Sequence, residues 1–556
     1  MRIGLLAEGG YPYASGEAGF WCDRLVRGLA QHVVDVYALS RSARQEDGGW
    51  VSLPPQVARV RTAALWEPPR DARRHGRHAR RRFATHVGQL AQAVCGTRED
   101  ADGSFAEGVY GLAELARESG GLAPALRSEA ALRALESACR APGARRGLHG
   151  VTVTELLALA DRLERALRPL SLDWYGEEDG LGAVDLCHAT SAGRAALAGL
   201  VAKRFFGVPL LVTEYGVRLR AHYLAGAEAG LSAPVRTLLA SFHRLLAAEV
   251  YRQAAVITPG NTHARRWQER CGADRAKLRT VYPGIDAEPF AAVGEAGDTV
   301  DPGVARTLVW VGRVEPAKDL ITLLHAFARV REREPDVRLR IITEPGRGRN
   351  SAAYLAHCKA LAARLVPAGA AGAAGAAGSS DDAPVVFAPR SGGPAEAYAA
   401  GGVSVLSSAV EGFPAGLVEA MLCGRATVST DVGAVVEVIG GTGLVVPPRN
   451  APALADACLA LLRDPERRAR LGAAARARAL ELFTAEQNVA AFRGIYLELL
   501  SHTPARRTAE AVNAAGDPVP FAHPAEDFLQ GAWTGRPGTP AWAERPVGAP
   551  VGGGRG

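Results

Sequence analysis

The segment VSVLSSAVEGFPAGLVEAMLCG, residues 403–424, reads as a strand, a turn and a helix in direct succession. Its first six residues, VSVLSS, read as a buried strand. Pro414 suits the first turn of a helix, where a missing N–H group loses no partner, and Gly424 suits the end of that helix. A strand that passes directly into a helix is the repeating unit of a parallel sheet with helices on its faces.

The same alternation extends to both sides of this segment. In sheets of this kind, ligands bind at the carboxyl ends of the strands. The strands predicted for the first half of the chain are 2–8, 33–40, 183–190, 209–216, 254–259 and 278–286. Those predicted for the second half are 307–314, 337–343, 385–389, 403–408, 426–430 and 443–447. The fold class is therefore α/β, with two Rossmann-like doubly wound domains that face each other across a cleft.

Breaks in this rhythm indicate the domain boundaries. Amphipathic stretches with few strand signals indicate a helical insertion, and the C-terminal residues are rich in Pro, Gly and Ala without periodicity. Helices are predicted at 193–206, 233–252, 351–365 and 485–500. The predicted parts are a first domain at 1–290 with its insertion at about 41–180, a linker at 291–305, a second domain at 306–484 with a low-complexity loop at 368–382, a terminal helix at 485–501 and a disordered tail at 502–556.

The bulk composition excludes several classes of protein. Apolar residues make up 48% and charged residues 22% of the 556, which is ordinary for a soluble globular chain. The net charge of +7 fits anionic small molecules as well as nucleic acid. The eight cysteines form no C-x-x-C pair and are interpreted as reduced thiols in a cytosolic protein. We expect no signal peptide, because the chain opens on a short strand, and no membrane span, because no run of 18 apolar residues occurs.

Two carboxylates frame the turn of the opening segment. Glu411 lies in the loop after the strand, and Glu419 lies in the second turn of the helix, with seven residues between them. A helix start offers free N–H groups and the positive end of the helix dipole. A ligand beside Gly412, Phe413 and Pro414 would therefore meet backbone donors with one acid on each side. The alternative is a helix-start carboxylate followed by a solvent-facing acid.

Two basic residues follow the first strand of the second half. The stretch WVGRVEPAKDL, residues 310–320, places Arg313 and Lys318 at the carboxyl edge of the sheet. Arg and Lys that face a helix N-terminus form an anion site suited to a diphosphate. The alternative is two solvated bases on a loop. The chain has no G-x4-G-K-[ST] loop and no His/Cys cluster, and we assign no metal role to its single D-x-D, Asp100 to Asp102.

These motifs together resemble the family 4 retaining glycosyltransferases, which have the GT-B fold of two Rossmann-like domains. GRVEPAKD is similar to the family's G-R-x4-K stretch, and EGFPAGLVEAM matches its E-x7-E motif. VYPGIDAEPF resembles the family's N-G-I-D segment, with Pro283 in place of Asn. FTAEQNVAAFRGIYLELL resembles the C-terminal helix that crosses back to the first domain. The resemblance covers about 184–500 and identifies 306–484 as the nucleotide-sugar-binding domain.

The resemblance implies transfer of a sugar from a nucleotide-diphosphate donor, a UDP-sugar, with retained anomeric configuration. Arg313 and Lys318 would neutralise the leaving diphosphate, which is the kind of electrostatic effect that usually dominates catalysis. Glu411 and His188 would lie beside the donor sugar, and Glu419 would hold the ribose hydroxyls. Neither a metal nor a cofactor is implied beyond this co-substrate. The implied catalytic residues are Arg313, Lys318, Glu411 and His188, and the implied substrate-binding residues are Glu419, Gly9, Gly10, Gly412, Phe413, Pro414, Glu214 and Tyr215.

A narrower resemblance is to the Pel-type exopolysaccharide glycosyltransferases. Their N-terminal E-G-x-Y-P-Y is present in EGGYPYASGEAG, residues 8–19, and DLCHATSAG and TEYGVRLR also have counterparts there. The subfamily reads T-E-H-G where this chain has Tyr215, and it has Gly at the place of Ala388. We expect position 215 to shape the choice of acceptor or sugar rather than phosphate binding.

We therefore predict a cytoplasmic glycosyltransferase, peripheral at the inner face of the membrane, with no nucleic-acid partner. Its acceptor would be a polysaccharide or glycolipid, and its partner a membrane polysaccharide synthase or export complex. One alternative is a transferase for a small acceptor such as an inositol phosphate, which requires a closed, basic acceptor pocket in the first domain. Another is a noncatalytic sugar-nucleotide-binding partner of a membrane synthase. The Arg-rich run at 70–83 fits anionic lipid, a charged polysaccharide or a solvated loop.

Overall fold

The computed structural model describes most of the chain, and all of the described residues belong to one compact unit. They are 1–13, 17–69, 71, 73–97, 101–225, 230–296, 302–344, 351–367 and 383–502. The low-complexity loop predicted at 368–382, Asp100 of the D-x-D and the tail at 503–556 lie outside these residues. None of the helices within the described ranges has the length and apolar character that crossing a bilayer requires.

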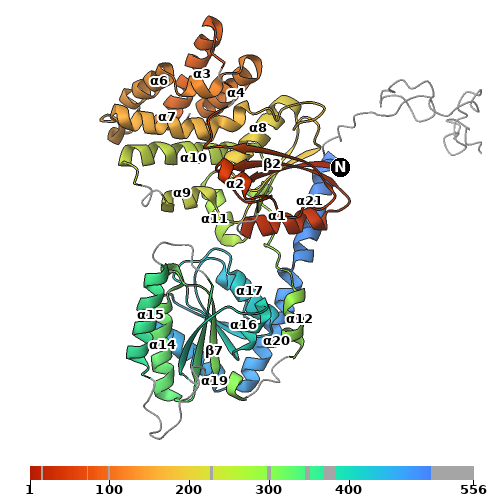
Figure 1. Ribbon diagram of the computed structural model, residues 1–556, viewed down its shortest axis with the longest axis vertical. Helices are drawn as coiled ribbons and strands as arrows, with labels where there is room; N and C mark the ends of the chain where they lie inside the picture. Colours follow the sequence, from red (N-terminus) through yellow and green to blue (C-terminus); the bar gives the residue numbers. More distant parts are fainter. Residues whose placement is uncertain are drawn as a thin grey trace, which may run out of the picture. The chain divides into compact units, whose positions relative to one another are not determined.

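The first half of the chain builds a sheet of six parallel strands in the order β3-β2-β1-β4-β5-β6 (Figure 1). The chain first winds outward from β1 to β3 and then returns to the other side of β1, so the strand order reverses between β1 and β4. The strands are β1 (Arg2–Glu8), β2 (Val33–Ser40), β3 (Val57–Ala64), β4 (Leu186–Ala189), β5 (Leu210–Glu214) and β6 (Val256–Pro259).

The second half builds an equivalent sheet in the order β12-β11-β10-β7-β8-β9, in which the order reverses between β7 and β10. Both sheets carry helices on their faces, and the prediction of two Rossmann-like α/β domains is confirmed (Figure 1). The strands are β7 (Thr307–Arg313), β8 (Arg338–Glu344), β9 (Val385–Pro389), β10 (Val403–Leu406), β11 (Ala426–Thr430) and β12 (Leu444–Val446).

The helices include the four that were predicted by residue range, namely α8, α10, α15 and α21. Those of the first half are α1 (Glu17–Gly28), α2 (Ala43–Asp47), α3 (Arg77–Cys95), α4 (Ala101–Ser119), α5 (Leu122–Leu126), α6 (Glu129–Arg140), α7 (Val153–Leu167), α8 (Arg194–Phe206), α9 (Arg218–Ala225), α10 (Ala233–Gln253) and α11 (Thr262–Arg270). Those that follow are α12 (Ala291–Ala296), α13 (Pro302–Ala305), α14 (Leu320–Arg333), α15 (Ser351–Leu365), α16 (Pro394–Ala399), α17 (Ala415–Leu422), α18 (Val435–Ile439), α19 (Ala451–Leu462), α20 (Pro465–Leu482) and α21 (Ala485–His502).

The helical insertion begins later than predicted, because β3 lies inside the range assigned to it. No strand is predicted for the β3 sequence VARVRTAA, which contains two arginines and a threonine. It is an edge strand that pairs in parallel with β2 alone, and edge strands tolerate such polar residues. The insertion proper comprises α3 to α7, which bury one continuous apolar cluster together with α8 and α10.

The strand predicted at 278–286 does not form. This segment runs beside β6 and donates two backbone hydrogen bonds to it, from Arg279 N to Ile257 O at 2.9 Å and from Val281 N to Pro259 O at 3.0 Å. Pro259 has no N–H to donate in return, so the ladder cannot continue beyond an isolated bridge. Two smaller differences concern the opening segment: its strand ends at Leu406 rather than 408, and Pro414 precedes the helix instead of lying in its first turn.

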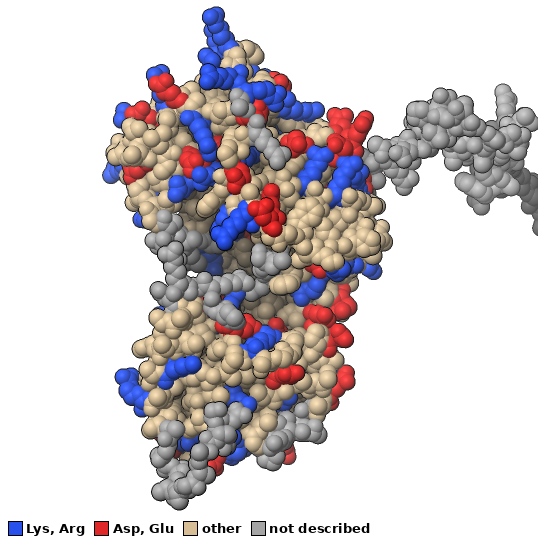
Figure 2. Space-filling view, in the orientation of Figure 1, with Lys and Arg blue, Asp and Glu red and all other residues tan. Residues whose placement is uncertain are grey.

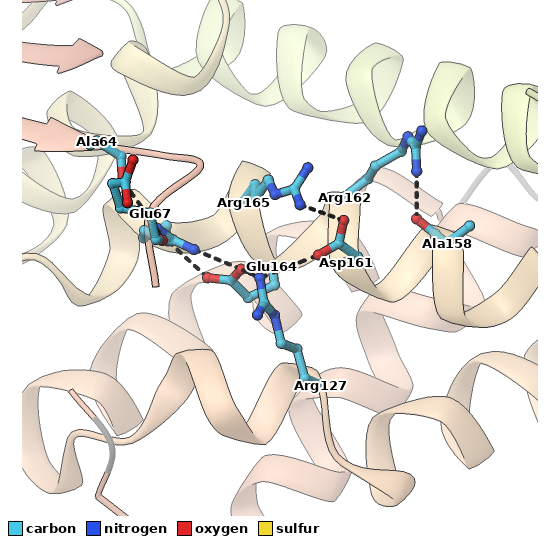
Figure 3. A network of polar contacts seen from close by, with 9 residues as sticks. Ala64, Glu67, Arg127, Ala158, Asp161, Arg162, Glu164 and Arg165 are labelled. Atoms are coloured by element: carbon cyan, nitrogen blue, oxygen red, sulfur yellow. Dashed lines mark hydrogen bonds and ion pairs between the residues drawn. The ribbon is translucent and has the colours of Figure 1, made fainter. Parts of the chain in front are cut away.

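A buried ion pair joins the insertion to the edge of the first sheet (Figure 3). Glu164 of α7 is fully buried and accepts two hydrogen bonds from Arg168, at 2.8 and 2.9 Å, and one from Arg127 at 2.6 Å. Arg168 also donates to the carbonyl of Ala64, the last residue of β3, at 3.1 Å, and to that of Glu67. The Glu164 carboxylate and the Arg168 guanidinium are therefore both paired and hydrogen-bonded, which offsets the cost of burying their charges.

The described part of the Arg-rich run leads into the first turns of α3. Arg73 pairs with Asp71 and Arg82 with Glu118, so part of its charge is offset within the chain. Figure 2 shows basic side chains gathered over the tip of the insertion, interspersed with acidic ones.

The last helix that the structure describes, α21, packs on the first sheet. Its buried residues Phe492, Tyr496 and Leu499 join the apolar cluster that contains Ile3 of β1 and Val36 of β2. Arg279 and Glu498 form an ion pair at the exposed rim of this contact. Helix α21 therefore covers strands from the beginning of the chain.

Candidate active site

The reversal of strand order in the second sheet brings two predicted site residues together. Lys318 follows β7, Glu411 follows β10, and these strands are neighbours in the sheet. Lys318 Nζ lies 2.6 Å from Glu411 Oε2, and the two side chains are 19% and 13% exposed. The hydroxyl of Ser408 donates to the same carboxylate oxygen at 2.9 Å. Such a reversal is the usual ligand position in an open α/β sheet, and here it holds a largely desolvated ion pair.

The two loops that carry this pair are tied to each other. The hydroxyl of Ser407 donates to the carbonyl of Lys318 at 2.8 Å, and Ala409 N donates to Ala317 O at 2.8 Å. Asp319 has a left-handed backbone, with φ of 46°, and its carboxylate accepts from Thr322 N at 3.2 Å to cap α14. The Lys318 backbone is thus held between β10 and the start of α14, which preorganises its side chain.

Arg313, the last residue of β7, lies on the same edge. Its Nε is 3.7 Å from Glu315 Oε1, and both side chains are 27% exposed. The separation of these groups is longer than that of a direct hydrogen bond. The structure therefore places the two predicted cations at one sheet edge, with an acid beside each of them.

Glu419 lies on α17 and has a partner of its own. Its Oε2 accepts a hydrogen bond of 2.8 Å from the hydroxyl of Tyr398, a buried residue of α16. Burial raises the pKa of Tyr398 well above its usual value, so the phenol keeps its proton and donates it. Glu419 is partly buried, which differs from the solvent-facing acid of the alternative interpretation.

The turn between the two acids is packed against the start of α18. Ala434 N donates to the carbonyl of Gly412 at 3.1 Å, and Phe413 meets the ring of Phe483 at 6.0 Å in a T-shaped contact. Gly433 has a φ of 58°, and a Cβ there would lie 2.5 Å from Glu411 O. Only glycine allows this approach. Pro414 is buried and Gly412 is exposed, so the open part of the turn is at Gly412.

His188 does not occupy the place predicted for it. It lies within β4 and is fully buried. Its Nδ1 is 2.7 Å from the hydroxyl of Tyr496 in α21, and its Nε2 is 2.6 Å from Thr213 Oγ1. Both nitrogens are engaged inside the protein, so the ring cannot line a donor sugar in this arrangement. Thr190, rather than His188, is the polar residue that directly follows β4. The position of His188 inside the strand sequence was the available signal that it would be buried.

The buried imidazole makes stability depend on pH. Burial lowers the pKa of His188 to about 3, against about 6.5 in an unfolded chain. Between these values the unfolded state binds more protons, so stability is lost as the pH falls, by up to about 1.4 kcal/mol per pH unit. We expect His188→Asn to unfold with a shallower pH dependence than the wild type between pH 4 and 6.5 in urea titrations. Tyr496→Phe, which keeps the imidazole, should retain the wild-type slope; an equal slope in all three proteins would contradict the assignment.

Glu214 and Tyr215, predicted to bind substrate, make internal contacts. Glu214 is buried at the end of β5 and accepts hydrogen bonds from Arg218 N at 2.7 Å and from the hydroxyl of Tyr251. Burial raises the pKa of Glu214. Tyr215 is partly buried, and its hydroxyl accepts from Asn488 Nδ2 at 2.9 Å. Glu214 therefore links the end of β5 to α9 and α10, whereas Tyr215 links it to α21.

The glycine loop after β1 leads to residues that the motif analysis missed. Gly9 is exposed with a φ of 73°, and its carbonyl accepts from Gln45 Nε2 at 3.0 Å, whereas Gly10 is buried. Directly before them, Glu8 binds Arg194, at 2.5 Å from Nη2, and Arg218. Glu8 belongs to the E-G-x-Y-P-Y motif, which was the available signal, but nothing local pointed to its two partners.

Among the residues that the structure describes, no group of three or more His, Cys, Asp or Glu side chains could hold a metal ion. The eight cysteines are free thiols, and seven of them are buried. The described site is thus composed of arginine, lysine, carboxylate and backbone groups.

Family models match the two halves of the chain separately. Residues 305–464 match the model of the glycosyl transferases group 1, and residues 1–276 match a domain of unknown function, DUF3492. The segment that builds the second sheet is therefore similar to the glycosyl transferases group 1. The model for the first segment assigns it no activity.

Several curated relatives of the chain are glycosyltransferases. The chain is 33% identical over 263 residues to D-inositol 3-phosphate glycosyltransferase of Kribbella flavida, covering 45% of this chain and 59% of the relative. It is 34% identical over 223 residues to phosphatidyl-myo-inositol mannosyltransferase of Mycobacterium tuberculosis, covering 38% and 52%. The chain thus spans little more than half the length of these relatives.

Solved structures share the fold. Sucrose-phosphate synthase from Thermosynechococcus elongatus matches with a TM-score of 0.53 at 17% identity, covering 90% of this chain and all of that one. Anabaena Alr3699/HepE in complex with UDP matches with a TM-score of 0.53 at 15% identity over the same shares. These likenesses establish the GT-B arrangement of two Rossmann-like domains.

Proposed function

We propose that the protein is a retaining glycosyltransferase that transfers a sugar from a nucleotide-diphosphate donor, a UDP-sugar, to a hydroxyl of a sugar-containing acceptor. The observation that carries the proposal is the Lys318–Glu411 pair, with Arg313 beside it, at the strand reversal of a group 1 glycosyltransferase domain. Cations held at this edge match the charge of a diphosphate leaving group.

The proposed reaction moves charge towards these cations. The bond between the anomeric carbon and the diphosphate oxygen breaks, and negative charge grows on that oxygen. Lys318 and Arg313 stabilise this charge without having to reorganise, because the loops around Lys318 already fix its backbone. The acceptor hydroxyl attacks the anomeric carbon from the face of the leaving group, and its proton passes to the departing diphosphate. No protein nucleophile is needed, and we propose that no metal or cofactor takes part.

The UDP assignment is supported by the structural likeness to HepE, which was solved with UDP, and by the position of Glu419. A carboxylate accepts two hydroxyl hydrogen bonds, as in the recognition of a ribose. Oε2 of Glu419 accepts a hydrogen bond of 2.8 Å from the hydroxyl of Tyr398. Tyr398 then orients the carboxylate towards the nucleoside end of the donor.

Two classes of acceptor are proposed. The E-G-x-Y-P-Y motif favours an exopolysaccharide or glycolipid, made at the inner face of the membrane with a membrane synthase. The names of the curated relatives favour an inositol phosphate or its lipid. Assays of wild-type protein with UDP-sugars and each acceptor class distinguish them by product formation. A noncatalytic sugar-nucleotide-binding partner would bind UDP and give no turnover with any acceptor, which would overturn the enzymatic proposal.

The two acids give a prediction that separates donor binding from chemistry. Glu419→Gln should weaken binding of both donor and free UDP by about 10- to 150-fold, the value of one charged hydrogen bond of roughly 1.5–3 kcal/mol. Glu411→Gln should lower kcat while UDP affinity stays near wild type, because Glu411 holds Lys318 beside the reacting bond. Calorimetric titration with UDP and steady-state kinetics measure both effects.

The reverse pattern, with UDP affinity lost in Glu411→Gln and kept in Glu419→Gln, would reverse the two assignments. Unchanged kinetics and binding in both variants would show that the pair only supports the start of α17. Exposed Glu129, whose pair with Arg133 lies on the insertion, provides the control Glu129→Gln, which should change neither quantity.

A further inference from the structure

The first sheet contains a second charged cluster at its own reversal of strand order. Glu8 is the last residue of β1, and Arg194 is the first residue of α8, which follows β4. Strands β1 and β4 are paired, and the order of the sheet reverses between them. Arg218 begins α9, directly after β5. This position is the counterpart, in the first sheet, of the one that holds Lys318 and Glu411 in the second.

The cluster carries an excess of positive charge. Arg194 donates to Glu8 Oε1 from Nε at 3.0 Å and from Nη2 at 2.5 Å, and Arg218 donates to the same oxygen. Burial raises the pKa of Glu8, but the two arginines outweigh burial and hold it at about 2, so the carboxylate is ionised. Two guanidinium groups therefore share one carboxylate. Burial, His222 and Arg194 lower the pKa of nearby His243 to about 3, so this ring adds no charge.

The guanidinium groups remain reachable, while other polar atoms of the cluster lack partners. The side chains of Arg218 and Arg194 are 48% and 26% exposed, whereas that of Glu8 is 7% exposed. Glu8 Oε2 and Ser191 Oγ are buried without a hydrogen-bond partner among the described residues. Both lie beside Gly193, where a Cβ would be 3.2 Å from Glu8 Oε2 and 3.3 Å from Ser191 Oγ.

The guanidinium groups and the unpartnered oxygens would each bind a different chemical group of a ligand. The surplus guanidinium charge attracts an anion, and arginine binds phosphate oxygens with paired N–H groups. The unpartnered carboxylate oxygen accepts a hydrogen bond and repels an anion, so it suits a hydroxyl. A buried acceptor without a partner is costly, and a ligand hydroxyl would remove that cost. The matching ligand is a polyol that carries a phosphate group.

We propose that Arg218 and Arg194 bind the phosphate of a phosphorylated polyol acceptor, and that Glu8 positions the two arginines and receives a hydroxyl of the same molecule. This inference rests on the proposed glycosyl transfer and names the acceptor class for it. It also assigns a function to the segment that matches a domain of unknown function. The same chemistry is offered by a free inositol phosphate and by a phosphatidylinositol headgroup.

The test measures binding rather than turnover. Wild type, Arg218→Gln, Arg218→Lys and the control Arg204→Gln are titrated with D-inositol 3-phosphate, uncharged inositol, inorganic phosphate, glucuronate and UDP. Arg204 is a matched control, because it lies on α8, is 56% exposed and pairs with Glu114 at 3.1 Å. Vesicles with and without phosphatidylinositol form a separate arm, which distinguishes a lipid headgroup from a free phosphate.

Arg218→Gln should weaken binding of the phosphorylated probe by about 10- to 150-fold, while Arg218→Lys loses less and Arg204→Gln stays within two-fold. The phosphorylated polyol should bind more tightly than inorganic phosphate, because its hydroxyls reach Glu8 and Ser191. Four results would each overturn the inference. The protein could bind uncharged inositol as tightly as D-inositol 3-phosphate, or prefer glucuronate to it. Arg218→Gln and Arg204→Gln could lose equal affinity, or neither the free inositol phosphate nor the phosphatidylinositol vesicles could bind. UDP binding distinguishes failure of the acceptor inference from failure of the proposed glycosyl transfer. If UDP binds normally and the acceptor test fails, only the acceptor inference is overturned. If UDP does not bind, the proposed transfer is overturned as well.

Discussion

Replacing Lys318 by alanine is expected to lower kcat by about 10²- to 10³-fold, the usual effect of removing one preorganised group that stabilises transition-state charge. Lys318 Nζ is 2.6 Å from Glu411 at the strand reversal, and its side chain is only 19% exposed. Water cannot take over the role of a cation that is fixed in this way. Steady-state kinetics with a UDP-sugar measure the loss, and thermal denaturation shows whether the fold persists.

Lys359→Ala is the matched control for this variant, because Lys359 is an exposed lysine of α15 on the same sheet. It should leave kcat unchanged. Lys318→Arg keeps the charge and should retain more activity than Lys318→Ala. A kcat for Lys318→Ala above a tenth of the wild-type value, with the fold intact, would contradict the assignment of leaving-group stabilisation to this residue.

The largest expected loss of stability follows from Glu164→Ala. This change leaves Arg168, whose side chain is 6% exposed, buried without its carboxylate. Removal of one partner from a buried ion pair typically costs about 3–5 kcal/mol. Because Arg168 also ties α7 to the last residue of β3, the insertion should loosen from the sheet edge. Urea unfolding, followed by circular dichroism, measures the change.

Glu129→Ala provides the comparison, since the pair of Glu129 with Arg133 is 76% and 75% exposed. Exposed helical pairs contribute only about 0.3–0.5 kcal/mol. The double variant Glu164→Leu with Arg168→Met should recover most of the lost stability, because apolar replacement of a buried pair is often neutral. A loss for Glu164→Ala no larger than that for Glu129→Ala would show that the network contributes little.

The site at the edge of the second sheet was more predictable than the charged cluster of the first sheet. Arg313, Lys318, Glu411 and Glu419 lie in motifs that follow strands, so their place at the carboxyl edge followed from the local pattern. The contact between Lys318 and Glu411 did not, because the residues are 93 positions apart. Which loops meet is decided by the pairing of β7 with β10, and strand order has no signature in local sequence.

His188 shows what the local motif could not predict. The motif placed it at a strand end, yet Tyr496, 308 residues later, lies against its ring. Glu214 is likewise buried, and it accepts a hydrogen bond from the hydroxyl of Tyr251 on α10. In both cases a helix from elsewhere in the chain buries a polar residue and satisfies its hydrogen bonds. Burial by a distant element cannot be deduced from the residues on either side.

The sequence by itself determined the α/β class, the doubling of the Rossmann-like domain, nearly all of the strands and the sheet edge at which Arg313, Lys318 and Glu411 lie. Those features depend on apolar periodicity, on turn residues and on the direction of each strand, which are properties of neighbouring residues. The tertiary structure alone decided that β3 completes the first sheet, that α21 covers His188, and that Glu8 gathers Arg194 and Arg218 from 186 and 210 residues away. These depend on which distant segments exclude water from one another, and only the folded chain brings those segments together.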